Sequence, residues 1–268
     1  MAGLPIKHMR RTLNALTRYL RAHAIRIWPL IGVLLLWQLL GAQLDAKTLP
    51  QPSAIADLLW QEATKGELFF HLGMTLRRVA ISFSIAMSIG VLLGVAMGIY
   101  QRLDQLLDTF LIIALNIPAL VTIVLCYIWF GLTETAAVVA VSLNKIPMVA
   151  ISLREGARAL DKNLSQVGLV YKLSKFDIAL KIIIPQLLPY LFGATRNGLA
   201  IIWKIVLVVE LLGCSNGVGF QIGNYFHFFD IAGVLAYTVA FTLVIFSIEL
   251  MMLRPIEKHL FRWRVSAC

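Results

Sequence analysis

Six long apolar stretches alternate with shorter polar segments along the chain. They cover about residues 27–44, 79–100, 106–130, 135–153, 187–212 and 231–253. Each is near or above the roughly 17 apolar residues that a membrane-crossing helix needs at minimum. The pattern therefore predicts an all-α membrane protein of about six transmembrane helices, with both ends of the chain on the same side of the membrane.

Basic residues distinguish the two predicted sides. Six lie in 1–26, one in 101–105, six in 154–186 and four in 254–268, whereas the opposite segments hold Lys47, Lys65, Arg77 and Arg78. Because cytoplasmic loops carry the excess of Lys and Arg, we expect cytoplasmic termini. The chain then comprises a basic N-terminal segment at 1–26, a transmembrane domain at 27–253 with a cytoplasmic loop at 154–186, and a basic tail at 254–268. A cleaved signal peptide fits poorly, because the basic region is long and no small-x-small site follows it directly.

Composition supports a membrane protein. The chain is 59% hydrophobic and 14% charged, with a mean hydropathy of +0.82, whereas soluble domains carry about 25% charged residues. The formal charge of +10 is compatible with nucleic-acid binding. However, the basic residues lie beside apolar segments rather than in one patch. We therefore expect membrane lipid, and no nucleic acid, as a partner.

Common catalytic and metal-binding motifs are missing from the sequence. It has no GxxxxGK[ST] phosphate loop and no HExxH, its three cysteines share no metal-ligand spacing, and its five histidines are scattered. We therefore predict no enzyme, no catalytic residue and no bound metal or cofactor. A transporter of this kind would take its energy from an ion gradient or from a partner.

Two features of the apolar stretches bear on helix packing. Small residues recur every four positions in the second stretch, at Ser82, Ala86, Gly90, Gly94 and Gly98. Such a ladder allows close helix approach in lipid, and we favour packing within the chain over a subunit interface. Prolines interrupt the third and fourth stretches at residues 118 and 147. Such breaks either line a transport pathway or only kink the helix.

Ionisable residues inside the apolar stretches are candidates for function, because each costs on the order of 3 kcal/mol at the membrane centre. Spacing by seven places Asn197 and Lys204 on one helix face. Arg196 and Glu210 lie nearer the helix ends, where they can snorkel or pair with neighbours. An excess of positive charge would suit an anionic substrate, although carbonyls or Glu210 could equally neutralise the lysines. The candidate pathway residues are Asn144, Lys145, Asn197, Lys204 and Glu210.

The loop at 154–186 is expected to fold into short helices. We predict one at 155–162, one at 164–173, and a third from a capping box at Ser174–Asp177 to Pro185. Val167, Val170 and Tyr171 form an apolar stripe at helical spacing. A solvated connector would not explain this stripe, so we predict a small helical knob that docks a cytoplasmic partner.

Several segments together resemble the six-helix permease of type I ATP-binding-cassette (ABC) importers, in the branch that handles nitrate, sulfonates and taurine. These segments are LPQPS at 49–53, WFGLTE at 129–134, ELL at 210–212 and GVGF at 217–220. The family's cytoplasmic signature is EAA, three residues, G, nine residues, I, one residue, LP. Counting back from Pro185 places Ile182 and Ile184 at its apolar positions, Lys172 at its glycine and 166–168 at EAA. Only the second half matches, because Gln replaces Glu and Lys replaces Gly.

The resemblance implies a permease subunit in the bacterial cytoplasmic (inner) membrane. Two copies, as a homodimer, would form a pathway lined by the third to fifth spans and alternate between outward and inward access. A cytoplasmic ABC ATPase dimer would use ATP and Mg²⁺, and an external solute-binding protein would meet residues 45–75 and 213–230. The implied coupling residues are Gln166, Val167, Gly168, Leu169, Val170, Tyr171, Lys172, Leu173, Ser174 and Lys175.

Two other classes of protein are compatible with a polytopic chain. An ion-coupled secondary transporter or channel would give gradient-driven flux alone, but the sequence shows no clear inverted repeat. A membrane enzyme or assembly factor would need a reactive set of residues, which the sequence lacks. An importer permease should instead copurify as a dimer with an ATPase.

Overall fold

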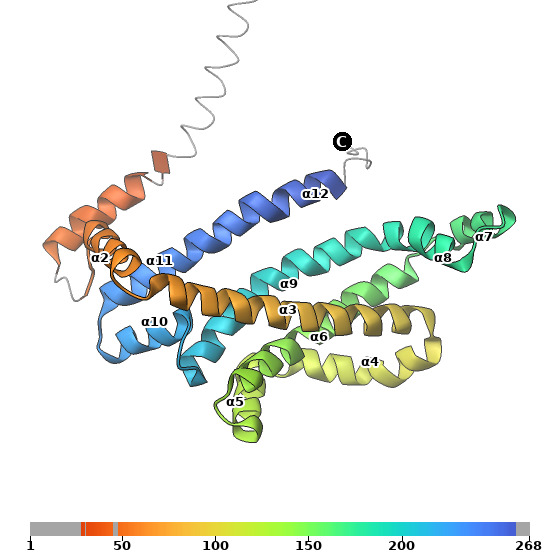
Figure 1. Cartoon of the computed structure of the whole chain (residues 1–268), viewed down its shortest axis with the longest axis horizontal. Coiled ribbons are helices and arrows are strands. Elements are labelled where there is room, and N and C mark those ends of the chain that lie inside the picture. The colour runs from red at the N-terminus through yellow and green to blue at the C-terminus, as the bar shows by residue number, and fades with distance from the viewer. Residues whose placement is uncertain (1–27, 30, 45–47, 261–268) are drawn as a thin grey trace, which may run out of the picture.

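The computed structural model describes residues 28–29, 31–44 and 48–260. These residues form helices joined by short turns, without a β-strand in the described ranges (Figure 1). The predicted segment 1–26 and the end of the predicted tail lie outside them. The helices are Ile31–Gln43, α2 Pro52–Thr64, α3 Leu68–Ile99, α4 Gln101–Asn116, α5 Ala119–Phe130, α6 Glu134–Arg158, α7 Lys162–Val170, α8 Lys175–Ile178, α9 Ile184–Gly213, α10 Val218–His227, α11 Ile231–Ile248 and α12 Arg254–Leu260.

Four helical segments are long and apolar enough to cross a membrane in the part of the chain that the structure describes. They are α3, α6, Lys175–Gly213 and Ile231–Leu260, and the bent pair of α4 and α5 would make a fifth. The predicted first span at 27–44 is represented by the shorter apolar helix Ile31–Gln43. The all-helical fold class is thus confirmed.

The predicted interruption at Pro118 is a real break. Helix α4 ends at Asn116, α5 begins at Ala119, and their axes differ by 97°. Pro118 lies immediately before the first residue of α5, where its missing N–H and fixed φ are tolerated. Pro147, by contrast, lies inside the continuous helix α6 and does not end it.

The second span begins at Leu68 and not at the predicted Val79, so it starts about three helical turns earlier than expected. Helix α3 begins at Leu68, so Arg77 and Arg78 lie inside it rather than in an outer segment. Leu68, Leu72 and Val79 are buried along one face, which extends the helix beyond the purely apolar window. The predicted apolar stretch did not include this extension because two adjacent arginines lower the local mean hydropathy.

The predicted helices of the loop at 154–186 also differ from the structure. The region 155–162 is not a separate helix, because α6 continues to Arg158 and α7 begins at Lys162. The third helix does not end at Pro185. It runs through the π-helical turn Ala179–Ile183 into α9, and Pro185 lies in the first turn of α9. Proline has no N–H to donate to the preceding turn. The i→i+5 hydrogen bonding of the π turn just before it lets the helix continue past this missing donor.

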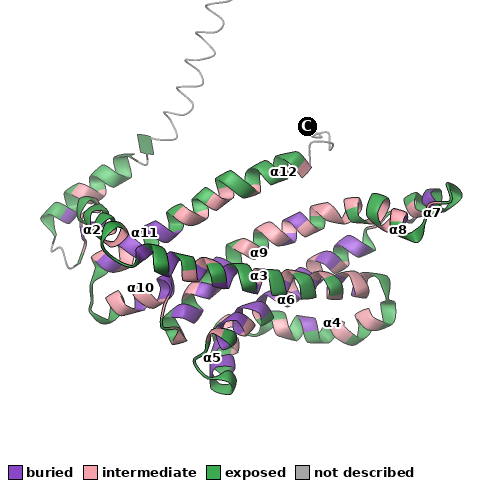
Figure 2. Ribbon diagram, viewed as in Figure 1, coloured by how far each residue is buried: buried purple, intermediate pink, exposed green. Residues whose placement is uncertain are grey.

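The small-residue ladder packs within the chain, along the contact between α3 and α6. A Cβ at Gly90 would lie 2.6 Å from Val149 Cβ, and one at Gly94 would press on the Ala150 carbonyl. Buried positions gather where α3, α6, α9 and α10 meet (Figure 2). Helices α3 and α6 therefore form one closely packed pair along much of the fold.

Candidate functional site

Helices α7 and α8, with the turn between them (residues 162–178), form a knob at one end of the molecule. Figure 1 places this knob far from α2 and α10. Its apolar side chains are uncovered: Val170 is 80% exposed, Tyr171 76% and Phe176 75%. Among the ten predicted coupling residues, only Gly168 is buried and Leu173 half-buried, whereas the others are exposed. The knob therefore presents an apolar surface that the described chain does not cover.

The ends of the knob helices are fixed by local hydrogen bonds. The Asp161 carboxylate accepts from the Asn163 N–H at the start of α7. The predicted cap of α8 is confirmed, because Ser174 Oγ accepts from the Asp177 N–H at 3.0 Å. Asp161 therefore fixes the start of α7, and Ser174 fixes the start of α8 just after the turn.

The C-terminus of α7 adopts the turn for which glycine is preferred. The Leu173 N–H donates to the Gly168 carbonyl at 3.0 Å, and the Lys172 N–H donates to the Leu169 carbonyl at 2.9 Å. This is the Schellman pair of hydrogen bonds, and Lys172 occupies its left-handed position with φ 55°. The lysine at the position where the importer signature has glycine thus adopts a conformation that disfavours a Cβ.

Some of the predicted pathway residues are buried and others are exposed. The buried lysine among them is Lys145. Lys145 is 1% exposed, and its Nζ lies 2.9 Å from Met148 Sδ. It has no carboxylate within ion-pair distance in the described part of the chain. Gly198 of α9 covers it so closely that a Cβ there would lie 2.9 Å from Lys145 Cε.

The other pathway candidates do not join Lys145 in one site. Asn197 and Lys204 are exposed on the face of α9 that the spacing predicted them to share. Asn144 is half-buried, and its amide donates to the Ala140 carbonyl at 3.3 Å. Glu210 is fully buried. In a single copy of the chain, these residues therefore do not surround a common cavity.

Glu210 belongs to a buried network centred on Arg78, which the sequence reasoning missed. Arg78 is 1% exposed, and its Nη1 donates to Glu210 Oε1 at 2.6 Å. Nη2 donates to Glu134 Oε2 at 2.7 Å. The guanidinium also donates to the backbone carbonyl of Asn216 at 2.9 Å and to its side-chain oxygen. We call Arg78, Glu134, Glu210 and Asn216 the arginine network.

The same region holds the start of α10 against α3 and α9. The Gly217 N–H donates to His71 Nδ1, the Val218 N–H to Thr75 Oγ1 at 2.8 Å, and the Gly219 N–H to Glu210 Oε2 at 2.8 Å. The first N–H groups of a helix carry a partial positive charge, so the Glu210 carboxylate is well placed there. Gly217 also needs its backbone freedom, because its φ is 110°.

The match to a family of known proteins decides what this chain is. Residues 86–254 match the family described as binding-protein-dependent transport system inner membrane component. The chain belongs to this permease family. It is therefore a multi-pass protein of the bacterial inner membrane, as the sequence predicted.

Relatives within this family are named for different solutes. The chain is 31% identical to an aliphatic sulfonates transport permease of Escherichia coli, over 80% of this chain and 82% of the relative. It is 26% identical to a nitrate import permease of Synechococcus elongatus, over 72% and 73%. It is 28% identical to a riboflavin transport system permease of Chloroflexus aurantiacus, over 98% of each.

A solved structure shares the fold of this permease. The chain resembles one from the inward-facing MetNI methionine ABC transporter, with a TM-score of 0.64 and 17% identity. The match covers 74% of this chain and 98% of that chain. The predicted ABC importer permease fold is thus confirmed.

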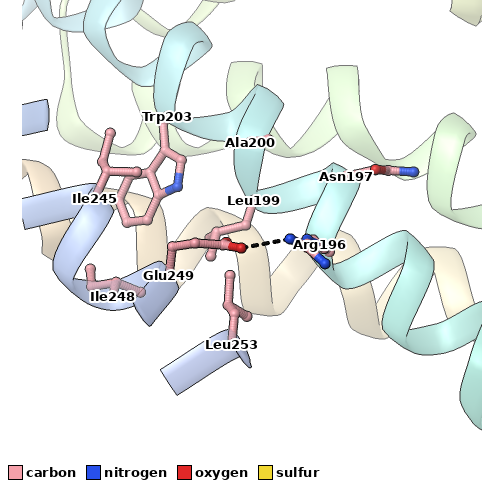
Figure 3. Close-up of a pocket in the computed structure, with 9 residues that line it drawn as sticks. All are labelled: Arg196, Asn197, Leu199, Ala200, Trp203, Ile245, Ile248, Glu249 and Leu253. Atoms are coloured by element: carbon pink, nitrogen blue, oxygen red, sulfur yellow. Dashed lines mark hydrogen bonds and ion pairs between the residues drawn. The ribbon is translucent and has the colours of Figure 1, made fainter. Parts of the chain in front are cut away.

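In this permease, Arg196 is paired with the last membrane helix, one of the two arrangements expected for it. Its guanidinium donates to Glu249 Oε1 at 2.7 Å and to Glu257 Oε2 at 2.8 Å. Figure 3 shows Arg196 and Glu249 meeting beside a cavity of about 180 Å³ between α9 and the end of α11. Because both carboxylates already engage Arg196, this cavity offers no free positive charge to an anion.

A pattern in the sequence could have revealed the arginine network of the permease. His71, Thr75 and Arg78 follow each other at spacings of four and three, which places polar groups on one face of a helix. The segments 129–134, 210–212 and 217–220, which carried the family resemblance, all reach this face through Glu134, Glu210 and Gly219. Three motifs that are separate in sequence therefore meet beside one buried arginine.

Proposed function

We propose that the chain is the permease subunit of an ABC importer, in which a cytoplasmic ATPase partner drives transport by alternating access. The observation that supports this most directly is the uncovered apolar knob in a member of a binding-protein-dependent transport family. A partner surface would remove Val170, Tyr171 and Phe176 from water. ATP and Mg²⁺ would be bound by the ATPase, not by this chain.

We infer that the knob lies on the cytoplasmic side. The residues around it include Arg154, Arg158, Lys172, Lys175 and Lys181, and an excess of basic residues is typical of cytoplasmic loops. The opposite end, with α2, α10 and the start of α11, would then face outward and meet the solute-binding protein. Of the predicted contact segments 45–75 and 213–230, the described residues 48–75 and 213–230 would supply this outer surface.

We propose that the pathway forms between two copies of the chain. Asn197 and Lys204 are polar groups on an exposed face of a membrane helix, where contact with lipid alone would be unfavourable. A second copy facing them would give the polar lining that they need. Lys145 lies behind Gly198 of α9 and would reach this pathway, with the neighbouring Asn144, after α9 moves. Glu210, which is held by Arg78, would support the wall of the pathway at its outer end.

The solute class that we propose is a small anion. Lys145 and Lys204 have no carboxylate within ion-pair distance in the described residues, so each could bind a negative group. The named solutes of two relatives, sulfonates and nitrate, are anions, whereas riboflavin is not. The unpaired lysines favour the anionic class for this chain.

The test is ATPase stimulation in the reconstituted complex of the chain, its ATPase and its binding protein. Ethanesulfonate and nitrate would be compared with riboflavin. We expect stimulation by an anion, and a large loss of it in Lys204→Ala with partial rescue in Lys204→Arg, because the charge attracts the solute. Lys258→Ala, an exposed lysine of α12 outside the proposed pathway and the proposed binding-protein surface, is the matched control and should behave like the unmodified chain. Stimulation by riboflavin alone would overturn the anionic proposal.

A further inference from the structure

Helix α4 has one fully buried residue, Leu111. Leu111 packs with Met97 of α3 and Ala150 of α6, and the partly buried Leu103 and Leu107 of α4 border the same cluster. The opposite face carries Leu106 and Phe110, which are both exposed. A helix with so little apolar contact depends strongly on whatever polar contacts it makes.

Those polar contacts form a cluster of ion pairs between α4 and the end of α6. Arg154 Nη1 pairs with Asp108 Oδ1 and lies 3.4 Å from Asp104 Oδ1. Arg158 Nη2 pairs with Asp104 Oδ2, and Arg158 Nη1 lies 3.4 Å from Glu155 Oε1. Asp104 and Arg154 are largely buried, so solvent screens this cluster less than it screens a surface pair. We call these five residues the ion cluster.

The ion cluster adjoins the knob. Arg158 is the last residue of α6, and Asp161, which caps α7, follows within one short turn. The Asp161 N–H donates to Gln186 Oε1 at 2.9 Å, which ties this turn to the start of α9. A displacement of α7 must therefore act directly on the segment that holds Arg154 and Arg158.

A cavity separates the knob from the ends of α3 and α6. Its volume is about 380 Å³, and it is lined by Ile99, Ala157, Ser165 and Ile183 among others. Because the knob is not packed against α3 there, it can move relative to α3. The covalent turn from Arg158 to Asp161 and the continuous helix into α9 remain as its firm connections.

From this arrangement we propose that Asp104 and Asp108 are positioning residues that make α4 follow the knob during transport. This inference rests on the proposed function, in which an ATPase displaces the knob. Arg154 and Arg158 carry the displacement laterally into the first turns of α4. The 97° break between α4 and α5 allows α4 to tilt while α5 stays packed on the core.

The test is hydrogen exchange of the full complex in lipid nanodiscs, with nucleotide absent and with ATP trapped by vanadate. We expect trapping to change amide exchange in both α7 and the first half of α4 of the unmodified chain. In Asp104→Asn/Asp108→Asn the change in α7 should persist, whereas the change in α4 should fall to less than half. Arg102→Gln, which removes an exposed charge of α4 outside the ion cluster, is the matched control and should keep both changes.

Two outcomes would overturn the inference for different reasons. An undiminished change in α4 of the double variant would show that α4 moves without the ion cluster. No change in α7 of the unmodified complex would reject the proposed function itself, and the inference with it. Arg158→Gln removes a half-exposed partner and should weaken the α4 response partially, so it keeps the test decisive if the double variant assembles poorly.

Discussion

The two ends of the molecule are built by opposite means. At the end opposite the knob, Arg78, Glu134 and Glu210 pair inside the protein and hold α3, α6, α9 and α10 together. At the knob end, Val170 and Tyr171 are uncovered and a cavity separates α7 from the bundle. One end is held together by buried charges, whereas the knob is held by local caps and turns and has an apolar surface that the described chain does not cover. If the proposed ATPase displaces the knob, the arginine network is the part of the fold that resists the motion.

A second set of contacts stabilises the end opposite the knob. Tyr225 and Tyr237 both donate to the Glu62 carboxylate, at 3.1 Å and 2.8 Å, and so join α2 to α10 and α11. Burial, reinforced by the Glu62 charge, raises the pKa of Tyr225 to about 12. The phenol therefore remains a donor over the whole physiological pH range.

The largest expected effect on stability comes from removing Arg78, the centre of the arginine network. Arg78→Ala leaves Glu210 as an uncompensated buried charge, which typically costs about 3–5 kcal/mol. We expect a strong loss of folded yield and of melting temperature in detergent. Arg77→Ala is the matched control, because Arg77 is exposed on the same helix. Equal melting temperatures for the two variants would break the contrast between the ends.

A smaller effect on stability is expected from changes in the small-residue ladder of α3. In Gly94→Ala the new Cβ would press on the Ala150 carbonyl and lie 2.9 Å from Leu153 Cβ. Overpacking of this kind costs about 1–3 kcal/mol. Gly73→Ala is the control in the same helix, because a Cβ there meets nothing within 4 Å. Thermal unfolding of both variants measures the difference, and a Gly94→Ala variant as stable as Gly73→Ala would contradict close packing of α3 on α6.

The smallest effect is expected in the turn of the knob. Lys172→Gly relieves a left-handed residue, which costs a non-glycine side chain about 1–2 kcal/mol. We expect slower hydrogen exchange in α7 and α8 and little change in global melting, because the knob is not packed into the core. Lys175→Gly, at the first turn of α8, should not slow exchange. Faster exchange in Lys172→Gly would contradict the assigned turn.

The sequence predicted those parts of the fold that depend on local pattern. Apolar periodicity located the membrane helices, Pro118 marked a true break, and Ser174 capped α8 as expected. Pro147 and Pro185 show the limit of this reasoning, because tertiary packing and a π turn keep both within helices.

Other features could not be predicted because they depend on contacts between distant segments. Arg78 lowers the hydropathy of its own helix, and only its pairing with Glu134 and Glu210 explains why it is buried. The ion cluster likewise joins Asp104 to Arg158 across the chain. For the candidate site, the exposure of the knob followed from its stripe, whereas the burial of Lys145 behind Gly198 did not.

Copurification of the ATPase with a knob variant tests the central claim most directly. Leu169→Asp places a charge in the uncovered apolar surface, and Phe228→Asp makes the same kind of change at an exposed apolar site at the other end. With the ATPase coexpressed, we expect Leu169→Asp to lose most of the bound ATPase and Phe228→Asp to retain it, with both variants folded. Full retention of the ATPase by Leu169→Asp would contradict docking at the knob.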